Sequence, residues 1–133
     1  MVVLAIKTDQ PKACIALHRI EPKQDCLDEI TWQAHRELSA TLLSKVEELL
    51  KRNNFVWSDI SGVIVYKGPG SFTGLRIGVS VANAIAYSLN VSVVATSSIS
   101  WQKKGLTMLK QGKGTKIVEP EYGAPAYTTK PRK

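Results

Sequence analysis

The stretch that most constrains the fold is residues 66–89, YKGPGSFTGLRIGVSVANAIAYSL, in which a glycine-rich turn precedes a long run with small residues every fourth position. Such spacing predicts one face of a helix. Glycine inside a helix costs roughly 1 kcal/mol against alanine, so we expect the row to admit another backbone at close range. The row comprises Gly70, Gly74, Gly78, Ala82 and Ala86. A second row, expected to bury against a sheet, comprises Leu75, Val79, Ile85 and Leu89.

Two kinds of segment could pack against a helix face that consists only of glycine and alanine. The first is an earlier helix of the same chain, and the second is another molecule. Geometry alone leaves both open.

The turn itself raises the question of a phosphate site. A GxxxxGK[ST] loop is excluded because Leu75 and Arg76 follow Gly74, and a GxGxxG fingerprint is excluded because Thr73 occupies its third glycine position. An anion can still bind at a helix N-terminus, although helix capping alone accounts for the hydroxyls. The candidate anion loop comprises Lys67, Gly68, Gly70, Ser71 and Thr73.

The rest of the chain alternates between strand and helix patterns. Leucines and a valine recur at helical spacing between residues 34 and 52, and Asn53-Asn54 suit the end of that helix. Strands are expected at 2–6, 13–20, up to about 32, 62–66 and 91–96, with further helices at 73–89 and near 97–104. This order predicts an α/β fold with a mixed sheet.

The bulk composition suits one compact domain, with 133 residues and 44% hydrophobic content. Residues 1–102 hold ten basic and nine acidic residues, whereas residues 103–133 hold eight basic and two acidic residues. We therefore expect a near-neutral lobe over 1–102 and a basic tail over 103–133 that is extended or disordered. The tail is either a solvated segment or a contact for RNA phosphates. The apolar start reads as a strand and not as a signal peptide, which predicts a cytoplasmic protein without a membrane span.

No catalytic constellation is apparent in the sequence. Cys14 and Cys26 are expected to be reduced thiols, and with His18 and His35 they form no metal-ligand spacing. Ser71 lies outside a GxSxG elbow. We expect no metal and no catalytic residue in this chain. Two adjacent acidic pairs are read as solvating charges: Asp28-Glu29 and Glu47-Glu48.

The motif GPGSFTGLRIG, residues 68–78, resembles the signature of the bacterial TsaB (YeaZ-like) family. The segments VVLAI, AHRELSATLLSKVEELL and VSVVATSSI support the resemblance in the expected order, over about residues 1–101. The resemblance implies an actin-like, ribonuclease-H-like lobe of the sugar-kinase and Hsp70 superfamily.

The resemblance also implies a function. A TsaB-like chain would be the non-catalytic partner of a TsaD-like catalytic subunit, with a TsaE-like ATPase, in a complex that transfers a threonylcarbamoyl group to adenosine beside the anticodon of tRNA. No cofactor is implied on this chain, since ATP and magnesium belong to the partner subunits, and a homodimer is expected when it is alone. The alternative is a stand-alone nucleotide- or phosphate-binding protein of the actin-like superfamily. The resemblance implies a partner interface at His35, Leu38, Leu42, Val46, Gly74, Arg76, Ile77, Gly78, Val81 and Ala82. The stripe of Leu38, Leu42 and Val46 fits an intramolecular core equally well. Arg76 is either a polar anchor of the interface or a solvated surface arginine.

The chain departs from the family pattern in two places. Lys7 stands where the family usually has an aspartate in its first turn, which argues against metal-assisted nucleotide hydrolysis. A solvated lysine or a phosphate contact is expected there. The second lobe of the family is almost absent, and EPEYGAPAY near the end resembles a remnant of the family's C-terminal segment. We therefore expect a shortened form of the family.

Overall fold

A computed structural model describes residues 2–21 and 23–119 of the chain. One five-stranded mixed sheet organises it, in the order β3-β2-β1-β4-β5. β1 pairs antiparallel with β2, and β2 antiparallel with β3, whereas β1, β4 and β5 run parallel. The strands are β1 (Val2–Lys7), β2 (Lys12–Arg19), β3 (Asp25–Gln33), β4 (Ile60–Tyr66) and β5 (Ser92–Thr96).

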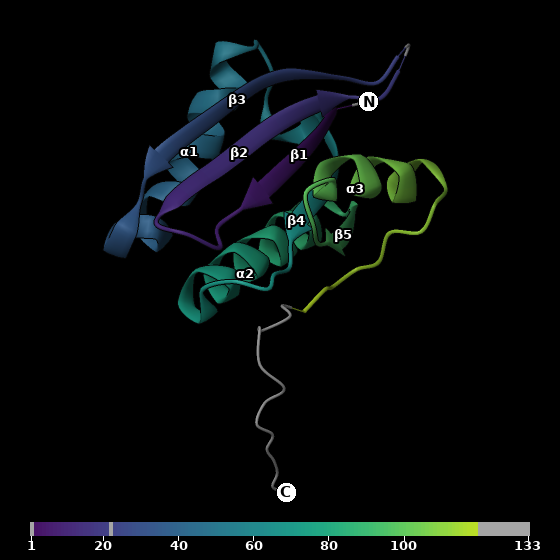
Figure 1. The fold of residues 1–133 in the computed structure, drawn as a ribbon. Coiled ribbons are helices and arrows are strands. Elements are labelled where there is room, and N and C mark those ends of the chain that lie inside the picture. Colours follow the sequence, from purple (N-terminus) through teal and green to yellow (C-terminus); the bar gives the residue numbers. More distant parts are fainter. Residues whose placement is uncertain (1, 22, 120–133) are drawn as a thin grey trace, which may run out of the picture.

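Helices cover both faces of this sheet. The helices α1 (Leu38–Arg52) and α2 (Phe72–Leu89) share one apolar core with the strands, whereas α3 (Trp101–Lys110) packs in a second core on the other face. Figure 1 shows α1 behind the strands and α3 in front of β4 and β5. Two short 3-10 helices, His35–Glu37 and Trp57–Asp59, precede α1 and β4. The expected α/β fold with a mixed sheet is confirmed.

The helix ends follow from local chemistry. Ser71 is the N-cap of α2, and its hydroxyl accepts a hydrogen bond from the Gly74 N–H at 3.5 Å, which confirms the capping prediction for this residue. At the other end Asn90 adopts a left-handed conformation with φ of 56°, a role for which asparagine is tolerated. The basic last turn of α1 contains Lys51 and Arg52, as the helix dipole favours.

The expected boundary at residue 103 is wrong. Helix α3 begins before it and continues through Gly105 to Lys110. A Cβ on Gly105 would lie 2.4 Å from Ile64 Cγ2, so glycine here allows α3 to lie directly on β4. Beyond the helix, Thr115 exchanges backbone hydrogen bonds with Val93 at 2.8 and 2.9 Å. The first part of the predicted tail therefore belongs to the folded lobe, and residues 120–133, including most of the proline-containing segment, lie outside the described residues.

No helix among the described residues has the length and apolar character that crossing a bilayer demands.

Candidate partner interface

The small-residue row of α2 does not form an open groove, because residues of the same chain fill it. A Cβ on Gly74 would lie 2.1 Å from the Thr8 carbonyl oxygen, and a Cβ on Gly78 would lie 2.1 Å from Thr8 Oγ1. At Gly70 the added atom would lie 2.5 Å from the Cβ of Asp9. Neither neighbour expected from the sequence occupies the row at Gly70, Gly74 or Gly78. The β1–β2 turn does so, and this corrects the expectation that the row is open to another molecule.

Several residues predicted for the interface are buried in the chain's own core. On α1 these are Leu38, Leu42 and Val46, each at most 5% exposed, and on α2 they are Gly78 and Ala82. For Leu38, Leu42 and Val46 this burial is the intramolecular core that the sequence left open as the alternative to an interface. Gly78 and Ala82 also face the chain's own atoms, which corrects their assignment to a partner interface. His35 begins the 3-10 turn before α1, and its side chain lies outside the described residues.

Two hollows on the outer surface of the protein lie along α1 and α2. A hollow of about 360 Å³ is lined by Ser39 of α1 and by Thr73, Arg76, Ile77, Ser80 and Val81 of α2. A second hollow of about 270 Å³ is lined by Leu43, Trp57, Ala84, Ile85, Ser88 and Leu89. We call these two hollows together the outer α1–α2 groove. Both rest on α1 and α2, and they include three of the predicted residues: Arg76, Ile77 and Val81.

The groove combines apolar and polar groups. Leu43 is 49% exposed although it follows buried Leu42 directly. The half-buried side chains of Ile77 and Val81 contact the core on one side and line the groove on the other. The Arg76 guanidinium lies 5.2 Å from the centre of the half-exposed Phe72 ring. This cation–π contact holds the arginine side chain near the N-terminal end of α2.

A third hollow of about 300 Å³ adjoins the groove at the start of both helices. Its walls include Leu38 from α1, Gly74 and Ile77 from α2, and Thr8 from the β1–β2 turn. The structure therefore brings the predicted residues at the beginning of both helices to one place. Sequence reasoning missed Ser39, Leu43, Ser80 and Ala84. The sequence signal that could have identified them is that each directly adjoins a residue of a predicted buried row and therefore lies beside that row on the helix surface.

The glycine turn uses its hydrogen-bond donors internally. The Ser71 N–H donates to the Asp9 carbonyl at 3.0 Å, and the Gly74 N–H is directed at the Ser71 hydroxyl. Gly68 has φ of 111°, a conformation that only glycine adopts readily. Because Ser71 and Gly74 are engaged within the chain and the Asp9 carboxylate belongs to the adjoining β1–β2 turn, this geometry gives no support to an anion in the turn. The candidate loop of Lys67, Gly68, Gly70, Ser71 and Thr73 remains a prediction.

Lys7 is not the solvated lysine that the sequence suggests. Its Nζ donates to Asp9 Oδ1 at 2.6 Å and lies 4.6 Å from the centre of the Tyr66 ring. The carboxylate of Asp9 is 8% exposed. Lys7 therefore neutralises a nearly buried charge in the turn that fills the glycine row.

Both cysteines are free thiols, in agreement with the sequence expectation. Burial, together with the neighbouring Glu29 carboxylate, raises the pKa of Cys14 to about 12, and burial also raises the pKa of Cys26. Neither is therefore activated as a nucleophile. Within residues 2–21 and 23–119, no three His, Cys, Asp or Glu side chains gather in a way that could hold a metal ion.

The strand order and the helices on both faces define a ribonuclease-H-like or actin-like lobe. RuvC from Thermus thermophilus shares this fold with a TM-score of 0.52 at 17% identity, covering 73% of this chain and 64% of that chain. YeaZ from Pseudomonas aeruginosa superposes with a TM-score of 0.66 at 26% identity, covering 84% of this chain and 50% of that chain.

Residues 30–112 match the family described as TsaD, tRNA N6-adenosine threonylcarbamoyltransferase. The chain belongs to this family, and it is TsaB/YeaZ-like within it. It is 35% identical over 99 residues to the tRNA threonylcarbamoyladenosine biosynthesis protein TsaB of Bacillus subtilis, covering 74% of this chain and 42% of the relative. TsaB of Escherichia coli is 31% identical over 78 residues, covering 54% of this chain and 34% of that relative. The chain thus spans less than half the length of these two curated relatives.

Proposed function

We propose that the chain acts in tRNA threonylcarbamoyladenosine biosynthesis as a non-catalytic subunit that docks a TsaD-type catalytic subunit through the outer α1–α2 groove. The observation that carries this proposal is a set of apolar side chains on two adjacent helices of a TsaB-like lobe: half-exposed Leu43 and partly buried Ile77 and Val81. Apolar residues in a shallow groove with a polar rim are typical of a protein interface.

The local chemistry agrees with a non-catalytic role. Lys7, at the position where the resemblance places an acid, is bonded to Asp9 and contacts Tyr66, so it supports the fold of the turn. The raised pKa of Cys14 keeps its thiol protonated at neutral pH. The remaining parts of the proposal follow from the family: a TsaE-like ATPase joins the complex, ATP and magnesium bind on partner subunits, tRNA is reached through the complex, and copies of this chain pair through the same groove when alone.

Co-expression with a TsaD-type protein tests the proposal. We expect the affinity-tagged chain to retain the TsaD-type protein through gel filtration. Ala84→Arg and Ser80→Arg place a large charge at exposed groove positions, and each should abolish co-elution while circular dichroism stays native.

The matched control is Thr31→Arg, which adds the same charge at an exposed position on the edge strand β3. Its complex should form normally. Retention of the TsaD-type protein by both groove variants would remove the groove from the proposal, and no association of the unmodified chain would contradict the docking role itself.

A further inference from the structure

A separate cavity of about 500 Å³ is lined by β5, by α3 and by residues that directly follow β4 and β5, and α3 covers the face of the sheet opposite α1 and α2. Lys67 follows β4 directly and Ser97 follows β5, so one wall of the cavity is the carboxyl end of two parallel strands. In open α/β sheets this edge is where ligands usually bind. Cavities of this volume hold small organic ligands.

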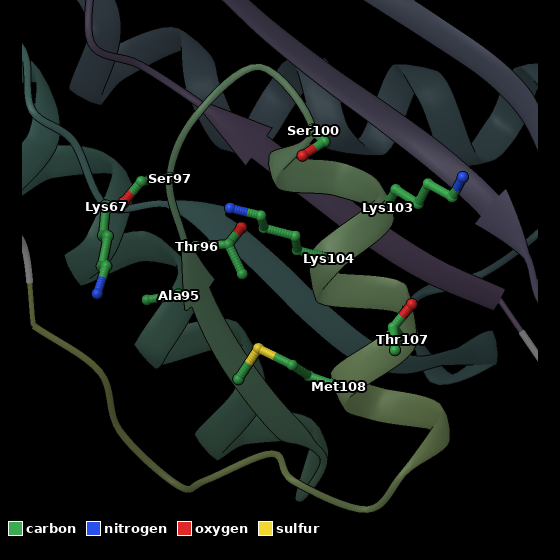
Figure 2. Close-up of a pocket in the computed structure, with 9 residues that line it drawn as sticks. All are labelled: Lys67, Ala95, Thr96, Ser97, Ser100, Lys103, Lys104, Thr107 and Met108. Atoms are coloured by element: carbon green, nitrogen blue, oxygen red, sulfur yellow. The ribbon is translucent and has the colours of Figure 1, made fainter.

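The cavity is lined by cationic, hydroxyl and apolar side chains together. Its lining residues are Lys67, Ala95, Thr96, Ser97, Ser100, Lys103, Lys104, Thr107 and Met108. None of them is acidic. Figure 2 shows Lys104 directed from α3 toward Thr96, with Met108 pointing into the space between α3 and β5.

Lys104 meets little negative charge among the residues that the structure describes. Its Nζ donates to the Ser98 hydroxyl at 3.1 Å, a neutral acceptor. Among the described residues no carboxylate lies within 4.0 Å of Lys103 or Lys104. The segment 101–119, which includes α3, holds five lysines and only one acid, Glu119, so this segment carries a net positive charge. This pattern favours an anionic ligand.

We propose that this cavity binds the phosphate of a nucleotide, free or within an RNA strand. Lys104 contacts the phosphate, Lys67 adds positive charge at the end of β4, and the hydroxyls of Ser97 and Ser100 supply neutral donors. Met108 and Ala95 offer the apolar surface against which a base packs. The cavity shares no lining residue with the outer α1–α2 groove, so this proposal can be tested separately from partner docking.

Titration calorimetry on the whole chain tests this directly, with AMP, ATP, uncharged adenosine and a short single-stranded RNA as four separate ligands. We expect a phosphate-bearing ligand to bind and adenosine not to bind. Lys104→Ala should weaken the binding roughly tenfold or more, because a charge-assisted hydrogen bond is lost. Met108→Ala should weaken it by a smaller factor. Lys51→Ala, on α1 across the sheet, removes the same charge as a control and should leave the affinity unchanged.

Each outcome bears on the proposal. Binding of AMP or ATP with the Lys104 dependence supports a free nucleotide as the source of the phosphate, whereas binding of RNA alone with that dependence supports an RNA strand. Absence of binding by all four ligands overturns the proposal, and so does binding that Lys104→Ala and Lys51→Ala weaken equally. A normal circular dichroism spectrum of each variant shows that the change is local. Failure here with intact TsaD-type association leaves the docking proposal untouched.

Discussion

The Thr8 hydroxyl lies over Gly78: a Cβ built on Gly78 would lie 2.1 Å from Thr8 Oγ1. The same hydroxyl donates to the Gly74 carbonyl at 2.7 Å. Thr8 is itself buried, and it follows β1 directly. Gly74 and Gly78 therefore allow the first two turns of α2 to pack directly against the residue that follows the central strand β1.

Gly78→Ala should destabilise the protein, although alanine is the better helix former. The added methyl group would lie 2.1 Å from Thr8 Oγ1 and must displace Thr8. For so close an approach we expect a cost toward the upper end of the roughly 1–3 kcal/mol typical of overpacking, which exceeds the roughly 1 kcal/mol gained in helix propensity. Urea denaturation would measure the change in the free energy of unfolding. A second substitution, Thr8→Ala, should reduce the Gly78→Ala penalty, because it removes Oγ1 from the contact. Stabilisation by Gly78→Ala alone would show that Thr8 does not occupy the row.

Asp28 of β3 accepts hydrogen bonds from residues at the end of α1, and we expect this contact to make the free energy of unfolding depend on pH in the acid range. Hydrogen bonds from Asn53 at 2.9 Å and from Arg52 at 2.7 and 3.1 Å lower the pKa of Asp28 below its ordinary value of 3.8. A carboxyl group with a lowered pKa in the folded state contributes stability above its unfolded pKa, and this contribution is lost as the pH falls through the folded value.

Asp28→Asn should therefore lower the free energy of unfolding at pH 7 by about 1 kcal/mol or less, since the pair is partly exposed. The difference between the two proteins should shrink as the pH falls below 3.8. Denaturation midpoints across this range provide the measurement. A difference that persists unchanged in acid would mean that the ionised carboxylate is not what joins β3 to α1.

Cys14 should alkylate very slowly at neutral pH, because a pKa of about 12 leaves almost no thiolate. Glu29 is the main charged group that raises this pKa, and Cys14 Sγ lies 3.7 Å from its Oε2. In a Cys26→Ser background, Glu29→Gln should accelerate iodoacetamide labelling at pH 9, with roughly a tenfold gain per unit of lowered pKa. Mass spectrometry follows the rate. An equal rate with and without Glu29 would leave burial as the only cause.

Much of the fold was predictable because the signals are local. Alternating and β-branched runs located the strands, and the leucine spacing of residues 38–50 located α1. The end of α3 was not predictable in this way, since Gly105 weakens a helix signal. Its place is set by contact with Ile64 of β4, a partner forty-one residues earlier in the chain.

The candidate site was predictable in outline only. The sequence identified the two helices, and Leu75, Val79 and Ile85 of the row expected to bury against the sheet are indeed buried. It did not show which positions beside the buried rows would stay exposed. Leu42 and Leu43 are neighbours, yet one is buried and the other is 49% exposed. The glycine row was predicted to need a close neighbour, and that was correct. That the neighbour is Thr8 depends on how β1 ends beside α2, which no local pattern encodes.

Hydrogen exchange of the chain with and without a TsaD-type subunit tests the central claim most directly. Protection of amide hydrogens should increase in the peptides that cover residues 39–43 and 73–84, where the outer α1–α2 groove lies, and should stay unchanged across α3. Protection confined to α3 or to the edge strand β3, with residues 73–84 exchanging as in the free chain, would contradict docking through the two helices.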